Sequence, residues 1–430
     1  MTSQMIFAQC VMGIVLLLMI SGKTPLYLTA ILGSALVAII AGFPLAGSEP
    51  ITVAKLVSSG LIGVIADMTG VLMFIGVLEA TGFLAAIVRS VIRFGTRLGG
   101  GPGVICAGSV AAGIIGMLTG YAPPIVTGAI ACPAAVKMGM DPNRAAGAQG
   151  HAGILGNFGG FTHPTQVAII GSAGIGFGLI NIAGAITALS VISFAFFRNY
   201  MKMKKEGKLL TPEQAQKILQ SMEKEDTNNI SSWKAFFPFL LMMIGFAVGL
   251  PVFIVGITCG LITILMARVN PAKGEAQMID GLKRMSIPLV ATIGFVFMGS
   301  VIKAIGLTET INTALKPVLD FSPILIMILV SCIAGLITQS YSASGVLTIP
   351  LLPVIIGAGV TPLAAAIAAC GPAAIFQHFL TGGPVANLPT LIPVTPGSTL
   401  KEANLFQRPN HIFGLIVCTV VAYMANYLIA

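Results

Sequence analysis

Long apolar stretches limit what this chain can fold into. Residues 167–197, for example, contain no Asp, Glu, Lys or Arg. A helix that crosses the hydrocarbon core of a bilayer needs about 20 mostly apolar residues. Of the 430 residues, 56% are hydrophobic and 9% are charged, far from the balance of a soluble domain. The chain is therefore predicted to be an all-α, polytopic membrane protein with room for about ten to twelve spans.

Charge and motif patterns exclude several functions. The net charge of +9 fits Lys and Arg retained in cytoplasmic loops, and no basic patch with interleaved aromatic residues indicates a nucleic-acid partner. The seven cysteines lack C-x-x-C spacing, so neither a disulfide framework nor a metal site is predicted. The P-loop, H-E-x-x-H and G-x-S-x-G motifs are absent from the sequence. We therefore expect a protein that is not an enzyme and uses no cofactor.

Residues 156–166, with the sequence GNFGGFTHPTQ, interrupt the apolar pattern. Their glycines, proline and polar side chains cannot continue a lipid-facing helix. Irregular backbone at membrane depth is tolerated only where it is buried in protein or lines a water-filled cavity. A second polar break, residues 119–124, lies upstream. Both are candidates for a binding site. The alternative is a re-entrant turn or a loop between helices at the membrane surface.

Two acids lie in apolar surroundings. Asp67 is expected between hydrophobic segments 56–66 and 70–88, and Glu79 inside the second of these. Ionisable groups within a membrane are costly and usually face a cavity. Asp67 and Glu79, together with His163, are therefore candidates for ion coupling. The alternative is a helix end among the lipid headgroups, which we favour for Asp67.

Three arginines, Arg89, Arg93 and Arg97, recur every fourth residue in segment 83–99 and share one face of a predicted helix. The opposite face is apolar, a pattern typical of an amphipathic helix at the membrane surface. The alternative is the cytoplasmic end of a helix with snorkelling arginines.

Residues 198–234 form the only long hydrophilic segment, with eight Lys or Arg against five acids. The positive-inside rule places this segment in the cytoplasm, and hence the protein in the cell (inner) membrane. Thr211 as N-cap, Pro212 at the first helical position and Gln214 two residues later predict a short helix that ends near residue 225. We therefore divide the chain into a first membrane half (1–197), a cytoplasmic linker (198–234) and a second membrane half (235–430).

The two halves form an internal repeat. At an offset of 220 residues, Tyr121 aligns with Tyr341 and Pro142 with Pro362, and further upstream an offset of 224 aligns Gly82 with Gly306. Segment 83–99 carries three arginines, whereas its counterpart 307–322 carries Glu309, Lys316 and Asp320. A segment that is basic in one half only indicates opposite faces of the membrane, hence an inverted repeat.

The repeat carries both polar breaks with it, at residues 339–342 and 377–387 of the second half. Paired interruptions in two halves point to the midplane site of a transporter. Helix N-termini at such breaks offer free N–H groups and a partial positive charge, which favour an organic anion. The predicted substrate-binding residues are Thr119, Gly120, Tyr121, Asn157, Gly159, Gly160, Thr162, His163, Thr165, Ser340, Ser342, Ser344, His378, Thr381, Gly382, Gly383 and Asn387.

His163 and His378 each lie in the second break of their half. Histidine changes charge near neutral pH, so either residue is suited to bind an anion when protonated or to relay a coupling proton. The alternative is a neutral histidine that fixes the loop through backbone hydrogen bonds. His151, on the helix that leads into the break, is expected to pack or to form an interhelical hydrogen bond.

Three segments resemble the gluconate permease family of the ion transporter superfamily, which also includes dicarboxylate and citrate carriers and the large membrane subunit of TRAP transporters. The segments are residues 24–32 with 41–45, residues 159–165, and residues 360–363 with 397–402. The resemblance implies a scaffold part and a mobile, elevator-like transport part built from re-entrant hairpins and broken helices. It also implies a homodimer.

These patterns predict a secondary active symporter in the lipid bilayer for a small organic anion, a carboxylate such as a sugar acid, hydroxy acid or dicarboxylate. Transport is expected to be coupled to H+ or Na+ by alternating access between the repeats. Two alternatives remain open. One is a cation/proton antiporter of the same fold that uses Asp67 and Glu79. The other is the membrane subunit of a binding-protein-dependent carrier.

Overall fold

The computed structural model describes residues 3–21, 23–24, 26–58, 61–120, 124–221, 230–248, 250–382 and 387–428, and every regular element in these ranges is a helix. The first half contains α1 (Ser3–Ile20), α2 (Leu26–Ile40), α3 (Val53–Ser58), α4 (Leu61–Ala80), α5 (Phe83–Gly95), α6 (Gly101–Thr119), α7 (Ile125–Lys137), α8 (Pro142–Gln149), α9 (Ala152–Phe158), α10 (Pro164–Ala173) and α11 (Leu179–Lys205). The linker contains α12 (Pro212–Gln220). The second half contains α13 (Ser232–Ala247), α14 (Val252–Met266), α15 (Pro271–Gly281), the short 3-10 turn η1 (Leu282–Met285), α16 (Ser286–Ala304), α17 (Leu307–Leu319), α18 (Pro323–Thr338), α19 (Tyr341–Gly357), α20 (Pro362–Phe376), α21 (Leu388–Leu391) and α22 (Leu400–Leu428). The expected all-α membrane fold is confirmed.

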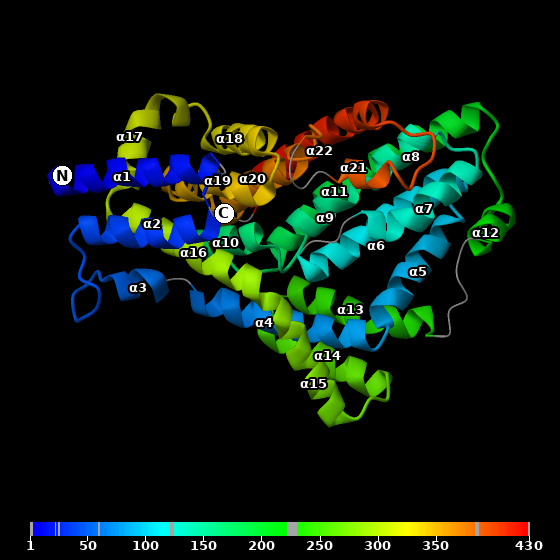
Figure 1. Ribbon diagram of the computed structural model, residues 1–430, viewed down its shortest axis with the longest axis horizontal. Helices are drawn as coiled ribbons and strands as arrows, with labels where there is room; N and C mark the ends of the chain where they lie inside the picture. Colours follow the sequence, from blue (N-terminus) through cyan, green and yellow to red (C-terminus); the bar gives the residue numbers. More distant parts are fainter. Residues whose placement is uncertain are drawn as a thin grey trace.

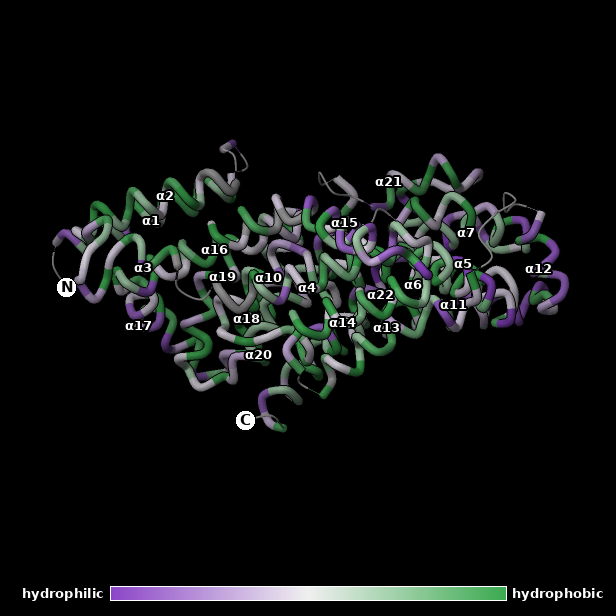
Figure 2. The backbone as a smooth tube through the Cα atoms, turned by 90° about the horizontal axis from the view of Figure 1, so that it is seen from below, coloured by the Kyte–Doolittle hydropathy of each residue, from purple (hydrophilic) through white to green (hydrophobic). Residues whose placement is uncertain are grey.

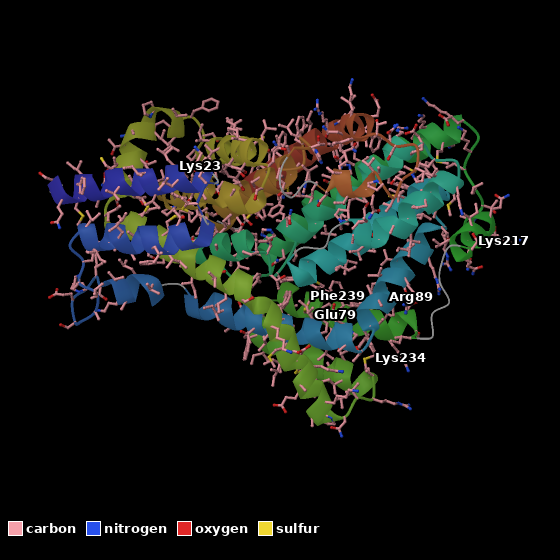
Figure 3. All side chains as sticks on the ribbon, in the orientation of Figure 1. Lys23, Glu79, Arg89, Lys217, Lys234 and Phe239 are labelled. Atoms are coloured by element: carbon pink, nitrogen blue, oxygen red, sulfur yellow. The ribbon has the colours of Figure 1, made fainter. Side chains whose placement is uncertain are left out.

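The molecule is elongated, with α1 and α2 packed side by side at one end and α12 at the other (Figure 1). In Figure 2 hydrophilic residues gather on α12, while the helices in the middle of the molecule are mainly hydrophobic. Lys217 of α12 lies at this hydrophilic end (Figure 3). This distribution fits a membrane-embedded body with a polar linker outside it.

Both halves contain a bent helix pair. Residues 65–80 and 83–95 meet at 75°, and residues 292–304 and 307–319 meet at 76°. The residue at each bend is a glycine in the left-handed conformation, Gly82 with φ 77° and Gly306 with φ 71°. These are the two glycines that the sequence repeat aligns, and left-handed backbone favours glycine because it has no Cβ. The repeat therefore extends to local structure.

A helical hairpin follows each bent pair, α6 with α7 and α18 with α19, and the helices of each hairpin pack together. The turn after each hairpin also repeats. Gly139 and Gly359 are both left-handed, and Pro142 and Pro362 both occupy the first position of the next helix. Proline suits that position because its missing N–H would have no helical partner.

Few helices in the described ranges have full spanning length. By length and composition, α1, α6, α11 and α22 qualify, and the two bent pairs would raise the number to six. The remaining apolar helices have 10–17 residues. In the described residues the number of full-length spans is thus lower than the expected ten to twelve, and the other apolar helices are too short to qualify by length.

The linker helix begins as expected. Thr211 Oγ1 accepts from the Gln214 N–H, and Gln214 Oε1 accepts from the Thr211 N–H, which is a capping box. α12 is described to Gln220, and residues 222–229 lie outside the described ranges. The first part of the hydrophilic segment differs from a simple linker, because α11 continues through it to Lys205.

The helix around Asp67 corrects the sequence interpretation. Asp67 does not separate two helical segments, because α4 runs without interruption from Leu61 to Ala80. Instead, Asp67 Oδ1 accepts a hydrogen bond from the Phe253 N–H at 3.3 Å, at the start of α14. α4 and α14 pack closely, since a Cβ on Gly70 would lie 2.6 Å from Phe253 Cα. Small residues at such contacts are typical of helix packing in membranes.

The arginine-bearing helix α5 packs against α6 and α13, with Leu84, Ile87 and Ile92 among its buried residues. Arg93 and Arg97 are exposed, so the amphipathic pattern is confirmed. The face of α5 that packs against the protein is the predicted apolar face, with Leu84 and Ile87.

Candidate functional site

The two breaks of the first half meet each other. The irregular backbone between α9 and α10 runs beside the end of α6, where the Phe161 N–H donates to the Met117 carbonyl at 2.9 Å. Thr162 Oγ1 donates to the Leu118 carbonyl at 3.3 Å. Gly120 ends α6 with φ 80°, and a Cβ there would lie 3.1 Å from the Thr162 carbonyl oxygen. The end of α6 can thus lie close to the backbone of the break because Gly120 has no side chain.

Asn181 fixes the backbone of this break. From the first turn of α11, its Nδ2 donates to the carbonyl oxygens of Gly159 at 3.2 Å and Gly160 at 2.5 Å. Its Oδ1 accepts from the Gly178 N–H at 2.9 Å. Buried backbone groups outside helices need such partners. Asn181 is a residue that the sequence analysis missed, although a fully buried amide in an apolar helix is the kind of signal that finds such positions.

The breaks of the second half are joined by two glutamine side chains. Gln377 Oε1 accepts from the Tyr341 N–H at 2.9 Å, at the start of α19. Gln339 Oε1 accepts from the Gly382 N–H at 3.0 Å, and Gln339 itself is left-handed with φ 47°. A non-glycine residue in this conformation is uncommon and often marks a functional site. Ser340 caps α19 by accepting from the Ala343 N–H.

The two pairs of breaks also meet across the halves. The rings of His163 and Tyr341 lie 4.7 Å apart, centroid to centroid. On α9, Gly153 leaves room for the second-half break, since a Cβ there would collide with Asn387 Nδ2 and lie 3.0 Å from His378 Nε2. All four predicted breaks therefore converge on one region of the protein.

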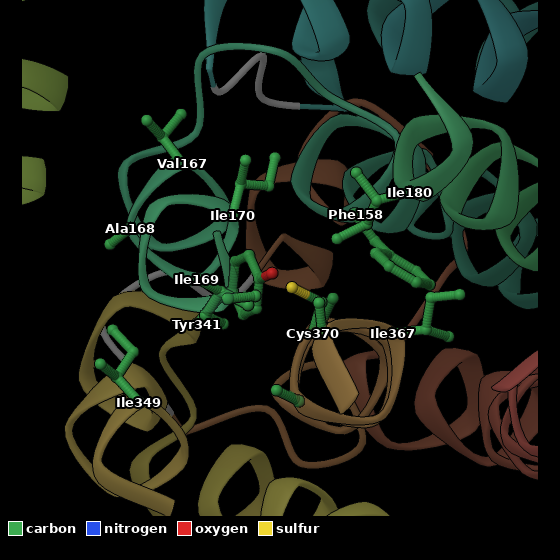
Figure 4. Close-up of a cluster of buried hydrophobic side chains, with 14 of the residues drawn as sticks. Phe158, Val167, Ala168, Ile169, Ile170, Ile180, Tyr341, Ile349, Ile367 and Cys370 are labelled. Carbon is green, nitrogen blue, oxygen red and sulfur yellow. The ribbon is translucent and has the colours of Figure 1, made fainter. Parts of the chain in front are cut away.

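An apolar layer adjoins this junction at Tyr341. Phe158, Ile169, Ile170, Ile349 and Ile367 come from α9, α10, α19 and α20 and pack in one cluster (Figure 4). In the same view the Tyr341 hydroxyl and the Cys370 sulfur point toward each other. The layer holds the ends of the broken helices in place, because close-packed side chains leave little room for movement.

Polar groups without partners lie at the start of α10. His163 caps this helix, because its Nδ1 accepts from the Thr165 N–H at 3.3 Å. Thr165 and Gln166 are fully buried, yet Thr165 Oγ1 and both amide atoms of Gln166 have no hydrogen-bond partner. Buried polar groups are normally satisfied, so such atoms mark a place where a ligand would supply the missing bonds. The positive end of the α10 dipole lies at the same place.

A cavity of about 640 Å3 lies farther along α10. It is bounded by α10, α16, α17 and α19, and its polar lining includes Ser172, Ser300, Lys303 and Glu309. The nearest α10 residue in its lining is Gly171, eight residues beyond His163, which is about 12 Å along a helix. The junction of the breaks is buried, so in this conformation the cavity stops short of it.

The other predicted binding residues take several positions. Thr162, His163, Thr165, Asn157, Ser344, His378 and Asn387 are buried, whereas Ser342 and Thr381 are half-buried and Gly382 is exposed. Gly120, Gly159, Gly160 and Ser340 lie at the hairpin tips and break described above. Tyr121 and Gly383 lie outside the described residues, and for Thr119 only the backbone is described.

The two acids lie elsewhere. Asp67 is at the contact of α4 with α14. Glu79 is exposed near the end of α4, close to the bend into α5 (Figure 3). Segments 119–124, 156–166, 339–344 and 377–387 contain no Asp or Glu. The junction therefore has no acidic side chain of its own to repel an anion.

Comparison with known proteins gives a likeness among solved structures. No protein-family model and no curated protein sequence matches the chain. Among solved structures, the chain is similar to the YdaH transporter of Alcanivorax borkumensis, with a TM-score of 0.56, 13% sequence identity and coverage of 98% of each chain. At this identity the likeness shows the fold alone. The chain is a polytopic, all-helical membrane protein with the fold of that transporter.

Proposed function

We propose that this protein is a secondary active transporter for a small organic anion. The observation that carries the proposal is the convergence of four breaks, two from each half, on one buried junction. Irregular backbone at membrane depth is costly unless it lines a binding site or a water path. Interrupted helices at matching positions of two repeats are the usual construction of a transporter's substrate site.

The chemistry of the junction favours a carboxylate. α10 begins there and directs the positive end of its dipole toward the break. Gln166 and Thr165 supply buried polar atoms that lack partners. The four break segments contain no acid. A sugar acid, hydroxy acid or dicarboxylate would satisfy these groups, as would be expected from the resemblance to gluconate permeases.

Alternating access would work through the cavity beside α10. Its polar lining, with Lys303 and Glu309 of opposite charge, would admit water and a polar solute. For the anion to reach Gln166, the helices around the junction must separate from α16 and α17. We propose that the two repeats are inverted in the membrane, that one part of the chain moves as an elevator against a scaffold, and that the scaffold forms a homodimer. In this arrangement the protein lies in the inner membrane of the cell, and the linker faces the cytoplasm.

Uptake into liposomes tests the proposal. The purified protein would be reconstituted, and labelled gluconate, lactate, citrate and succinate would be offered with an inward gradient of H+ or of Na+. We expect accumulation of at least one of these carboxylates in response to one ion gradient, and no response to ATP. Protein-free liposomes give the background. Absence of uptake for all four anions under both gradients would contradict the proposal.

A further inference from the structure

Three of the four histidines gather around the start of α9. His151 lies directly before α9, and its ring lies 5.1 Å, centroid to centroid, from the ring of His411 on α22, in an edge-on arrangement. His378 reaches the same turn from the second half, since its Nε2 would lie 3.0 Å from a Cβ on Gly153. His378 also accepts from Asn387 Nδ2 at 3.4 Å. The cluster thus adjoins the junction of the breaks.

Two histidines of the cluster have buried ring nitrogens without a hydrogen-bond partner: His151 at Nδ1, and His411 at both nitrogens. His151 forms the expected interhelical hydrogen bond, because its Nε2 accepts from Asn410 Nδ2 at 2.8 Å, and Asn410 Oδ1 accepts from Arg198. His411 is fully buried, and neither of its ring nitrogens has a hydrogen-bond partner. A neutral imidazole always has one nitrogen with a free lone pair. A proton that binds to His411 therefore displaces no hydrogen bond, whereas His151 already accepts one at Nε2.

The protein supplies no counter-charge for that proton. The helices that pack around the cluster, α6, α8, α9, α11, α18, α20, α21 and α22, contain a single carboxylate, Glu402. It lies nine residues before His411, about 13 Å along α22. The other charged or titratable groups on these helices include Arg198, Arg408, Cys370 and Cys418, and Arg144 lies farther out with two carboxylates, Asp141 and Glu206, at the linker-side cavity. A buried positive charge without a partner is strongly unfavourable.

We infer that His151, His378 and His411 form the proton-binding site of this transporter, and that the cluster takes up a proton only when an organic anion is bound at the junction. This inference rests on the proposed function. The carboxylate of an anion bound at the junction, which the cluster adjoins, is the missing counter-charge. By thermodynamic reciprocity, the proton then strengthens anion binding as much as the anion strengthens proton binding. The coupling ion is H+, and neither partner binds well alone.

A polar route links the cluster to the linker side of the protein. Arg198 joins Asn410 to the end of α11, and next to it Asn199 is 2% exposed with both amide atoms unpartnered. Asn199, Arg144 and Glu206 line a cavity of about 180 Å3 beside the linker. Arg198, Asn410 and His151 thus form a hydrogen-bonded chain from the cluster toward this polar side of the protein.

Calorimetric titration tests the inference in the purified, full-length protein. Gluconate, lactate, citrate and succinate are titrated between about pH 6 and pH 8, in two buffers of different ionisation enthalpy, so that proton uptake is measured directly. For the wild type we expect affinity to fall about tenfold for each pH unit, because binding is linked to uptake of one proton. The variant His411→Phe keeps the ring shape and loses no hydrogen bond, and we expect it to bind without this pH dependence. Thr419→Val, on the same helix, is the control and should behave as the wild type.

The outcomes separate the inference from the proposed function. If an anion binds and is transported with pH-independent affinity, or if His411→Phe keeps the wild-type slope, the histidine cluster is not the proton site and the inference fails alone. If an anion binds with proton uptake but is not transported, the inference stands and the proposed function fails. If none of the four anions binds, both fail. Should His411→Phe not fold, His411→Gln takes its place with the same expectations.

Discussion

The imidazole ring of His163 lies 4.7 Å, centroid to centroid, from the phenol ring of Tyr341. His163 ends the break of the first half and caps α10, whereas Tyr341 begins α19 in the second half. Each half thus contributes one ring to the contact. If transport requires the helices around the junction to rearrange, this contact must break and re-form during the cycle, because packed interfaces switch between discrete arrangements.

The two break histidines should differ in function. His163 uses Nδ1 to cap α10, whereas His378 lies with Asn387 at the histidine cluster. We expect His378→Ala to lose most uptake while the protein still folds. His163→Ala should lose about 0.5–2 kcal/mol of stability, the usual cost of a lost N-cap. Uptake assays and thermal unfolding measure the two effects.

The variant His163→Asn is the control for this comparison. Asparagine is a good N-cap, so it should restore the stability that alanine loses and keep most of the uptake. Wild-type uptake by His378→Ala from about pH 5.5 to pH 8 would contradict the function proposed for His378, and an unchanged melting temperature of His163→Ala would contradict the capping function of His163.

Asn181 should be critical for the shape of the first break. Asn181→Ala removes the donor to the Gly159 and Gly160 carbonyls and the acceptor for the Gly178 N–H. Each buried group left without a partner costs about 1–3 kcal/mol, so we expect a clear fall in melting temperature and loss of uptake. Asn181→Asp keeps the acceptor but places a carboxylate against the two carbonyl oxygens, so it should be at least as unstable as alanine. A melting temperature unchanged by Asn181→Ala would show that the clamp does not hold the break.

A methyl group at Gly153 should push the second-half break away from α9. In Gly153→Ala the new Cβ would collide with Asn387 Nδ2. Overpacking of this kind costs about 1–3 kcal/mol, and the displaced Asn387 and His378 should weaken anion binding. Gly13→Ala is the matched control, because no atom lies within 4 Å of the new Cβ on α1. Anion affinity and thermal unfolding of both variants are compared. Wild-type affinity in Gly153→Ala would contradict the proposed contact between α9 and the second-half break.

Asp67 separates the symporter from a cation/proton antiporter. Its Oδ1 accepts from the Phe253 N–H, a bond that asparagine can also form. If Asp67 only positions α14, Asp67→Asn should transport the anion like the wild type, whereas Asp67→Ala should lose about 1 kcal/mol of stability through the lost cap. Loss of ion-driven transport in a stable Asp67→Asn variant would instead identify Asp67 as the ion carrier.

Local patterns in the sequence predicted the features that local forces determine. The capping box at Thr211 and Gln214 is formed as expected, because all its bonds lie within four residues. The break before His163 follows from glycines and proline that a membrane helix cannot hold. The interruption expected at Asp67 was wrong. An acid in an apolar run resembles a break, and only the distant Phe253 N–H makes a continuous helix acceptable there.

The residues that sequence reasoning missed are defined by tertiary contacts. Asn181, Asn410 and His411 lie within the long apolar helices α11 and α22, where no local motif marks them. Their significance comes from what they face: break carbonyls for Asn181, and His151 for the other two. The one signal in the sequence was that a polar residue inside an apolar membrane helix is costly to bury. This signal marks Asn181, Asn410 and His411 equally and does not show which groups they contact.

Binding measured after changing Gln166 tests most directly whether an organic anion occupies the junction of the breaks. Both amide atoms of Gln166 are buried without partners, so Gln166→Ala removes no hydrogen bond from the protein alone. We predict an unchanged or higher melting temperature, together with about tenfold or weaker affinity for the bound carboxylate, which corresponds to about 1.4 kcal/mol. Wild-type affinity in a stable Gln166→Ala protein would contradict an anion site at the start of α10.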